Sequence, residues 1–287
     1  MAKGRELKGR IKSVENTKKI TRTLEMVATS KLKRAQDRAF AARPYANALR
    51  EVMAALYAPE LAERFPLLRQ PKRVKTAAVL LVTSNRGLCG AFNGNLVKEA
   101  RTLIKRLEGE GSAVELHAVG RKAIGYFKYV NRAMAAQRTD LGDKPTAADA
   151  ASLVDALMDR FASGQLDAVY VVYAKFNSVV STPPTNEQIL PVAVPAKTGT
   201  VRDFILSPGP EAILSELLPL AVRNAVYRAL IETAAGFQAA QRTAMKSATD
   251  NASDMLTNLR RTYNRARQAQ ITQEIAEIVG GAAALSG

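Results

Sequence analysis

The stretch LKGRIKSVENTKKITRTLEMVA, residues 7–28, begins the helical pattern that decides the fold of this chain. Its seam positions recur at alternating spacings of four and three, which is typical of a coiled coil. The pattern predicts one helix that continues past Pro44 with a local bend and ends near residues 57–59. At 1.5 Å per residue, about 55 residues would extend about 80 Å. The seam positions are Leu7, Ile11, Val14, Lys18, Thr21, Glu25, Ala28, Leu32, Ala35, Ala39, Ala42, Ala46, Leu49, Met53 and Leu56.

The other end of the chain, residues 211–285, also predicts one very long helix. One apolar frame runs through Met245, Ala248, Ala252, Met255, Leu259 and Ala266, and a second through Ile271, Ile275, Ile278, Ala282 and Leu285. The slip between the frames, at residues 267–269, either alters the supercoil locally or moves the apolar stripe onto a different neighbour. We expect the two ends of the chain to pair with each other.

An apolar patch on the first helix does not fit that pairing. Ile20, Leu24, Met26 and Val27 point away from the predicted seam. Both terminal helices are therefore expected to face something besides each other.

The middle of the chain has an α/β pattern. Strands are predicted at 74–83, 113–119 and 168–174, with shorter ones at 187–191 and 202–206. Helices are predicted at 93–108 and 121–129, and a capping box at Thr146 and Asp149 opens another to about residue 162. The fold class is therefore α/β, with long terminal helices and a central, Rossmann-like, largely parallel βαβ domain. The predicted domains are 1–58, 73–207 and 211–287.

Charge and composition limit the function classes. The net charge of the 287 residues is +16, and residues 1–50 hold fourteen Lys or Arg against four acids. That surplus favours an anionic partner, and the alternative is a solvated helix face. We expect no transmembrane helix and no signal peptide, and the single cysteine, Cys89, indicates a reducing compartment.

Candidate chemistry is sparse in this sequence. The glycines at 87, 90 and 94 follow a strand, but their spacing matches neither dinucleotide-binding nor P-loop patterns. Cys89 and His117 are a weak candidate for a nucleophilic pair, and one Cys with one His is too few for a zinc site. The basic first helix keeps nucleic-acid binding open, although no known nucleic-acid-binding motif is present. We expect no cofactor, no metal and no catalytic residue.

Three motifs, in order and from both ends of the chain, resemble one family, the gamma subunit of the F-type ATP synthase. They are LKGRIKSVENTKKIT with EMVA at 25–28, TSNRGLCG at 83–90, and MKSATDNA at 245–252 with YNRARQAQITQEI at 263–275. The loop departs from the family by carrying Ser84 and Asn85 where an acidic residue is common before the arginine.

The resemblance implies a non-catalytic rotor subunit of the central stalk. Its two long helices would form an antiparallel coiled coil inside a ring of three alpha and three beta subunits. Its α/β domain would join the epsilon subunit and the ring of c subunits, so that proton flow drives conformational cycling of the head and ATP synthesis. Membrane association would be indirect, on the cytoplasmic face of a bacterial plasma membrane, with a processed mature chain as the alternative origin.

The resemblance also implies contact residues. Leu24, Met26, Arg267, Gln268 and Ile271 would be shaft contacts with beta subunits, and Arg86 and Cys89 would lie near the lower face of the head. Ordinary coiled-coil packing is the alternative role for Leu24 and Ile271. An independent basic coiled-coil module that binds nucleic acid or acidic membrane is the alternative function.

Overall fold

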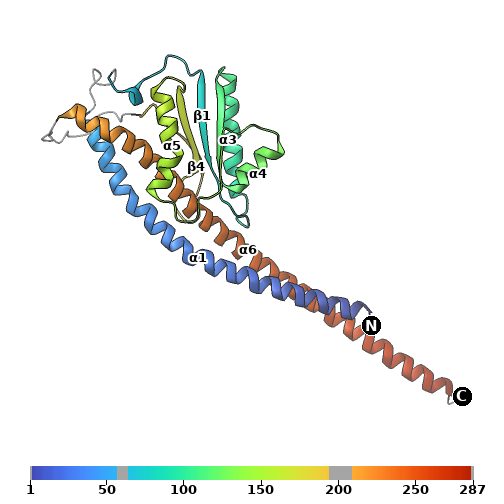
Figure 1. Cartoon of the computed structure of the whole chain (residues 1–287). Helices are drawn as coiled ribbons and strands as arrows, with labels where there is room; N and C mark the ends of the chain where they lie inside the picture. The colour runs from blue at the N-terminus through green and yellow to red at the C-terminus, as the bar shows by residue number, and fades with distance from the viewer. Residues whose placement is uncertain (1, 57–63, 194–208, 286–287) are drawn as a thin grey trace. The chain divides into compact units, whose positions relative to one another are not determined.

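The computed structural model describes residues 2–56, 64–193 and 209–285 (Figure 1). The chain divides into two compact units, one of residues 1–28 with 242–287 and one of residues 29–241. We call the first the coiled-coil unit and the second the α/β unit. This division cuts across both long helices, whereas the predicted domains follow the order of elements along the chain and stay predictions.

Two helices build the coiled-coil unit: the first part of α1 (Ala2–Leu56) and the last part of α6 (Pro210–Leu285). The hydroxyl of Thr249 lies 2.9 Å from that of Thr21, and Arg260 donates to Glu15 at 2.6 Å. The contacts move toward the start of α1 as they move toward the end of α6. The helices are therefore antiparallel, as the family resemblance implied.

The predicted seam of α1 is confirmed, because every one of its positions is buried or half-buried. The predicted frame of α6 is partly wrong. Met255 is 53% exposed, and the buried positions are Met245, Thr249, Ala252 and Leu256. The seam keeps a polar residue at 249 because its hydroxyl is satisfied within the helix by the carbonyl of Met245 and across the seam by Thr21.

The α/β unit is built around a five-stranded sheet in the order β3-β2-β1-β4-β5. The first four strands in that order are parallel, and β5 runs antiparallel to β4. The largely parallel βαβ domain is thus confirmed. The strands are β1 (Thr76–Val82), β2 (Ala113–Val119), β3 (Ala136–Arg138), β4 (Ala168–Ala174) and β5 (Pro184–Leu190).

Helices cover both faces of the sheet, which explains the nearly unbroken apolar runs in β1 and β4. On one face lie α3 (Phe92–Gly109) and α4 (Arg121–Tyr129). On the other lie α5 (Ala147–Ala162) and segments of α1 and α6, which contribute Leu49 and Val222 among others. Figure 1 shows α5 and α3 on opposite sides of β1 and β4. A short 3-10 helix, η1 (Pro66–Leu68), packs against the α5 face.

Most predicted elements are confirmed, and β2, β4 and α4 match to the residue. The capping box of α5 has both of its hydrogen bonds. The Thr146 hydroxyl accepts a hydrogen bond from the Asp149 N–H, and the Asp149 carboxylate accepts one from the Thr146 N–H. The helix α1 continues through Pro44, as predicted. The strand β3 was not predicted, because three residues carry too short a pattern. The predicted strand at 202–206 and the predicted end of the first helix lie outside the described residues.

No helix in the described ranges carries an apolar stretch long enough to cross a bilayer.

Candidate partner-binding surfaces

The carboxyl ends of β1 and β2 meet at one edge of the sheet, where open parallel sheets commonly place their binding crevices. Thr83, just after β1, donates its hydroxyl to the carbonyl of Val119 and accepts from the Ala123 N–H at 3.1 Å. Gly120 has φ of 97°, and a Cβ there would lie 2.3 Å from the Thr83 carbonyl oxygen. Only glycine fits this crossing, which draws the loops after both strands together.

The loop after β1, residues 84–90, is held in shape by its own side chains, and we call it the glycine loop. Ser84 donates to the carbonyl of Arg86 at 2.6 Å and to Asn93 at 3.0 Å. Leu88 and Gly90 have positive φ, of 62° and 57°. A leucine in this conformation is unusual and is held there by its surroundings. Its side chain is 62% exposed, so the loop presents an apolar group to solvent.

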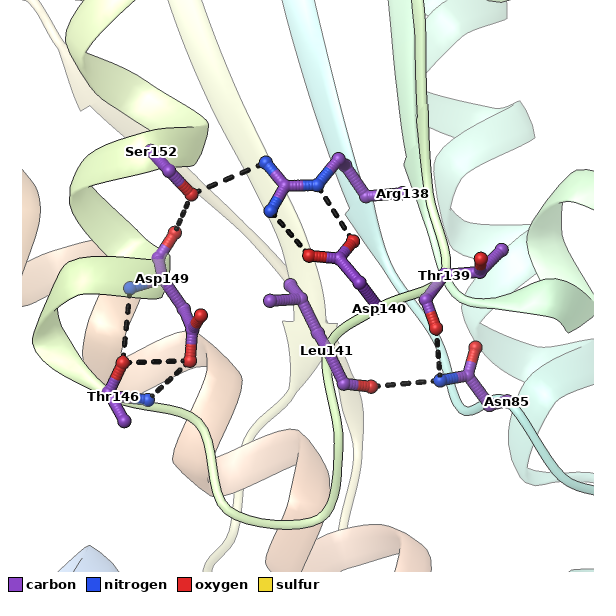
Figure 2. Close-up of polar contacts among 8 residues, drawn as sticks. All are labelled: Asn85, Arg138, Thr139, Asp140, Leu141, Thr146, Asp149 and Ser152. Atoms are coloured by element: carbon purple, nitrogen blue, oxygen red, sulfur yellow. Dashed lines mark hydrogen bonds and ion pairs between the residues drawn. The ribbon is translucent and has the colours of Figure 1, made fainter.

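A second loop, residues 139–146 between β3 and α5, forms the opposite wall and is fixed at both ends (Figure 2). At its start, the Asn85 amide donates to the carbonyls of Thr139 and Leu141 at 3.0 and 2.8 Å. Arg138 makes two hydrogen bonds to Asp140 at 2.8 and 2.7 Å and one to Ser152 of α5 at 3.3 Å. At the loop's end stands the capping box of α5.

One carboxylate in this loop, Asp143, joins three parts of the α/β unit. It accepts from Lys31 of α1 at 3.0 Å and from Arg86 of the glycine loop. Burial raises the pKa of Asp143, but the hydrogen bonds from Lys31 and Arg86 outweigh burial and hold the pKa below its ordinary value. The Arg86 guanidinium also lies 5.9 Å from the ring of Phe237 on α6. Arg86 is thereby positioned by two neighbours.

Between the two loops lies a cleft of about 600 Å³. Its lining includes Arg86, Arg121 and Lys144. The carboxylate of Asp143, also in the lining, accepts a hydrogen bond from Arg86. Asn85 accepts from the Arg121 N–H, and Ser84 accepts from the N–H of Lys122. The start of α4 therefore offers these amides to protein groups instead of a ligand. The surface is basic, and it suits an acidic partner better than a phosphate bound by backbone amides.

The structure separates Cys89 from His117. Cys89 is buried on the α3 face, its sulfur accepts from Asn93 at 3.2 Å, and burial raises the pKa of its thiol. His117 lies on the α5 face, 3.8 Å from Glu115, which Arg160 of α5 binds through two hydrogen bonds. Burial lowers the pKa of His117. The two side chains lie on opposite faces of the sheet and form no nucleophilic pair.

The coiled-coil unit carries exposed apolar side chains outside its seam. On α1 the predicted patch is confirmed for three of its four members, while Leu24 is half-buried. On α6, Arg267 and Gln268 are exposed. The exposed apolar side chains, with their exposed fractions, are Ile20 (60%), Met26 (56%), Val27 (46%), Met255 (53%), Ile271 (46%), Ile275 (56%), Ile278 (71%) and Val279 (62%).

The predicted contact residues thus fall into two groups. Arg86 and Cys89 lie together in the glycine loop of the α/β unit, and the other five lie in the coiled-coil unit. Sequence reasoning missed Asp143 and Leu88. Leu88 lies between Gly87 and Gly90 in the motif at 83–90, and this position could have indicated an exposed loop residue. No local pattern marks Asp143, because its partners are 112 and 57 residues away.

Comparison with known proteins gives consistent matches along the chain. A family model described as ATP synthase matches residues 3–285. The ATP synthase gamma chain of Gemmatimonas aurantiaca is 68% identical over 290 residues, with both chains fully covered. That of Acidithiobacillus ferrooxidans is 43% identical over 289 residues, covering 99% of this chain and all of the relative.

Two solved structures share the fold. A chain in the Euglena gracilis mitochondrial ATP synthase (OSCP/F1/c-ring) has a TM-score of 0.70 at 19% identity, covering 99% of this chain and 95% of that one. A chain in the Tetrahymena thermophila mitochondrial ATP synthase (central stalk/c-ring) has a TM-score of 0.62 at 23% identity, covering 80% and 99%.

Proposed function

This chain belongs to the family of ATP synthase gamma chains, and we propose that it works as the rotor of the central stalk. The observation that carries the proposal is the uneven surface of the coiled-coil unit. Its seam positions on α1 are buried or half-buried, while Ile20, Met26 and Ile271 expose about half or more of their surface. Large exposed apolar side chains mark surfaces that partners cover.

The uneven surface suggests how rotation would be converted into chemistry. If three identical sites surround the helix pair, each meets a different side of it at any moment. A contact shifts a site's conformational equilibrium only by the difference in its affinity for the two states. A smooth helix pair would give no difference between sites. In this proposal the gamma chain supplies no catalytic group, and the alpha and beta subunits carry out the reaction.

We assign the contacts as follows. Leu24 and Met26 on α1, with Arg267, Gln268 and Ile271 on α6, contact beta subunits. In the glycine loop, Arg86 and Cys89 lie near the lower face of the head. Because the Cys89 side chain is buried, contact there would run through its backbone and through its exposed neighbour Leu88.

The remaining partners follow from the family. One copy would sit in a ring of three alpha and three beta subunits, and the α/β unit would bind the epsilon subunit and the c ring. Proton flow through the c ring would then turn the helix pair. The complex would place this chain at the cytoplasmic face of a bacterial plasma membrane, as a peripheral subunit.

The test is the double variant Arg267→Ala with Gln268→Ala in the assembled synthase. Both side chains are exposed, so the fold should be unchanged while ATP-driven proton pumping falls. The matched control is Arg261→Ala with Thr262→Ala, which removes a cation and a polar group from exposed positions six residues earlier on α6. Pumping that is equal in the double variant and the control would contradict the contact assignment.

Co-purification tests the function itself. A rotor associates with alpha and beta subunits in a fixed ratio of one to three to three. A chain that instead purifies alone and binds nucleic acid or acidic vesicles would favour the alternative, an independent basic coiled-coil module.

A further inference from the structure

Phe176, two residues after β4, is held by both long helices at once. Its N–H donates to Glu232 of α6 at 3.0 Å, and its carbonyl accepts from Arg43 of α1 at 2.8 Å. The two bonds hold one residue's backbone from two different helices. We call Arg43, Phe176 and Glu232 the Phe176 clamp.

The side chain of Phe176 strengthens this arrangement, because it is fully buried between the same helices. It forms a separate apolar cluster in which three alanines leave room for the ring, and the ring centroid lies 6.3 Å from that of Phe40. The Arg43 guanidinium stands 4.7 Å from the Phe40 ring, which keeps it oriented toward the clamp. The other cluster members are Leu32 and Ala35 of α1 and Ala235 and Ala239 of α6.

The clamp is tied directly to the sheet. The last residue of β4, Ala174, donates its N–H to the Thr233 hydroxyl of α6 at 3.2 Å. Within β4, Tyr173 donates to Glu187 of β5 at 2.9 Å, and Glu187 is paired with Arg228 of α6. Hydrogen bonds and an ion pair thus connect the central strand β4 to α6, both directly and through β5.

A buried carboxylate is a costly component of such a joint. Glu232 is 4% exposed, and burial raises its pKa. Apolar packing alone would hold the helices to the sheet, but the hydrophobic effect is non-directional and specifies the register of the contact less strictly. Hydrogen bonds in a buried site fix the register, and a buried polar group left without its partner is unfavourable. A joint that must resist sliding therefore has a physical use for Glu232.

We propose that the Phe176 clamp transmits torque between the sheet and the segments of α1 and α6 that pack against it. The inference rests on the proposed rotor function. Each of α1 and α6 is one unbroken helix, so a torque applied along the helices reaches Arg43 and Glu232 through continuous backbone. Bonds to both polar groups of one residue resist its displacement toward either helix.

The experiment uses the assembled synthase in membrane vesicles, with Arg43→Ala and Glu232→Ala as separate variants. The control for Arg43→Ala is Lys33→Ala, which also removes a cation from α1; Lys33 is paired with Asp37, one turn away on the same helix. The conservative variant Glu232→Gln keeps an oxygen that can accept the Phe176 N–H. Three quantities are measured: amide exchange in the peptide containing Phe176, ATP hydrolysis with an uncoupler present, and the steady proton gradient that hydrolysis sustains.

We expect faster exchange at Phe176 in Glu232→Ala, by about fivefold for one lost hydrogen bond. The rate of ATP hydrolysis with the uncoupler present should match that of the wild type, because no proton gradient then opposes rotation. The sustained gradient should fall in Arg43→Ala and Glu232→Ala, recover in Glu232→Gln, and stay at the wild-type level in Lys33→Ala.

A gradient that stays at the wild-type level although exchange is faster would overturn the proposal, and so would unchanged exchange. A loss of hydrolysis with uncoupler as large as the loss of gradient would also overturn it, since that is the signature of a merely structural role. Failure of the rotor function looks different, because wild-type vesicles would then couple no hydrolysis to proton movement at all.

Discussion

The central strands β1 and β4 of the α/β unit bury their apolar side chains almost completely, whereas the coiled-coil unit leaves many of its apolar side chains exposed. Every residue of β4 is buried, and the sheet is covered on both faces. In the other unit, Ile20 is 60% and Ile278 is 71% exposed. Apolar residues therefore have two roles in one chain. In the first unit they stabilise the fold, and in the second many of them remain available to partners.

The difference has a geometric cause. A strand in the middle of a covered sheet has neighbours above, below and on both sides, so all of its residues can pack. Each helix of an antiparallel pair has one neighbour and buries one stripe. The polar pair of Thr21 and Thr249 lies in that stripe, while the described core of the sheet is mainly aliphatic and aromatic. A thin seam is enough for two helices to pair and leaves the other sides free.

The largest effect should come from truncating matched leucines in the two units. Leu81→Ala in β1, where the side chain is fully buried, should lower the free energy of unfolding by about 3–4 kcal/mol. Leu256→Ala in the seam should cost about 1–2 kcal/mol, because a seam between two helices collapses around the gap more easily. Urea unfolding followed separately in each unit by amide exchange measures both values. Equal losses would break the comparison.

A smaller effect should separate polar from apolar packing in the seam. Thr249→Val removes the hydrogen bond to Thr21 and should cost about 1 kcal/mol. The double variant Thr21→Val with Thr249→Val should cost little more than the single one, because it removes only one further hydrogen bond, from the Thr21 hydroxyl to the Lys18 carbonyl within α1, which contributes little to stability. A double-mutant cycle on thermal unfolding measures the coupling. Strict additivity would show that the hydroxyl pair contributes nothing specific to the seam.

The smallest effect concerns pH and the loop beside the cleft. Hydrogen bonds from Arg138 lower the pKa of Asp140 from 3.8 to about 2. The folded pKa is depressed, so the stabilisation is present above pH 3.8 and is lost as the pH falls toward 2. The pair is exposed, and solvent screening limits the contribution to less than about 1 kcal/mol. In Asp140→Asn, the free energy of unfolding of the α/β unit should depend less on pH between these values. The coiled-coil unit should be unchanged, and amide exchange followed separately in each unit measures both.

The sequence predicted the elements well where a long pattern repeats. The seam of α1 follows from periodicity, and the strands β2 and β4 follow from short runs of β-prone residues, since neighbouring residues carry both signals. The frame of α6 was misjudged at Met255 because the buried position at 249 is polar and its partner lies 228 residues away. The strand β3 escaped notice since three residues hold no period.

The candidate surfaces were predictable in part. A motif identified the glycine loop, and the misfit with the seam identified the patch on α1; the structure adds which side chains there are accessible. It shows that Leu88 is exposed beside a buried Cys89. Asp143 and Phe176 carry no local motif, because their roles come from partners that are remote in the sequence.

The amino-acid order by itself determined the helix pair, the βαβ middle and the basic first helix, because each is written in the spacing or charge of nearby residues. The tertiary structure alone decided that Lys31 and Arg86 share one carboxylate and that both long helices hold the backbone of Phe176. Such contacts depend on where distant segments meet. No local pattern encodes a distance between residues more than fifty positions apart.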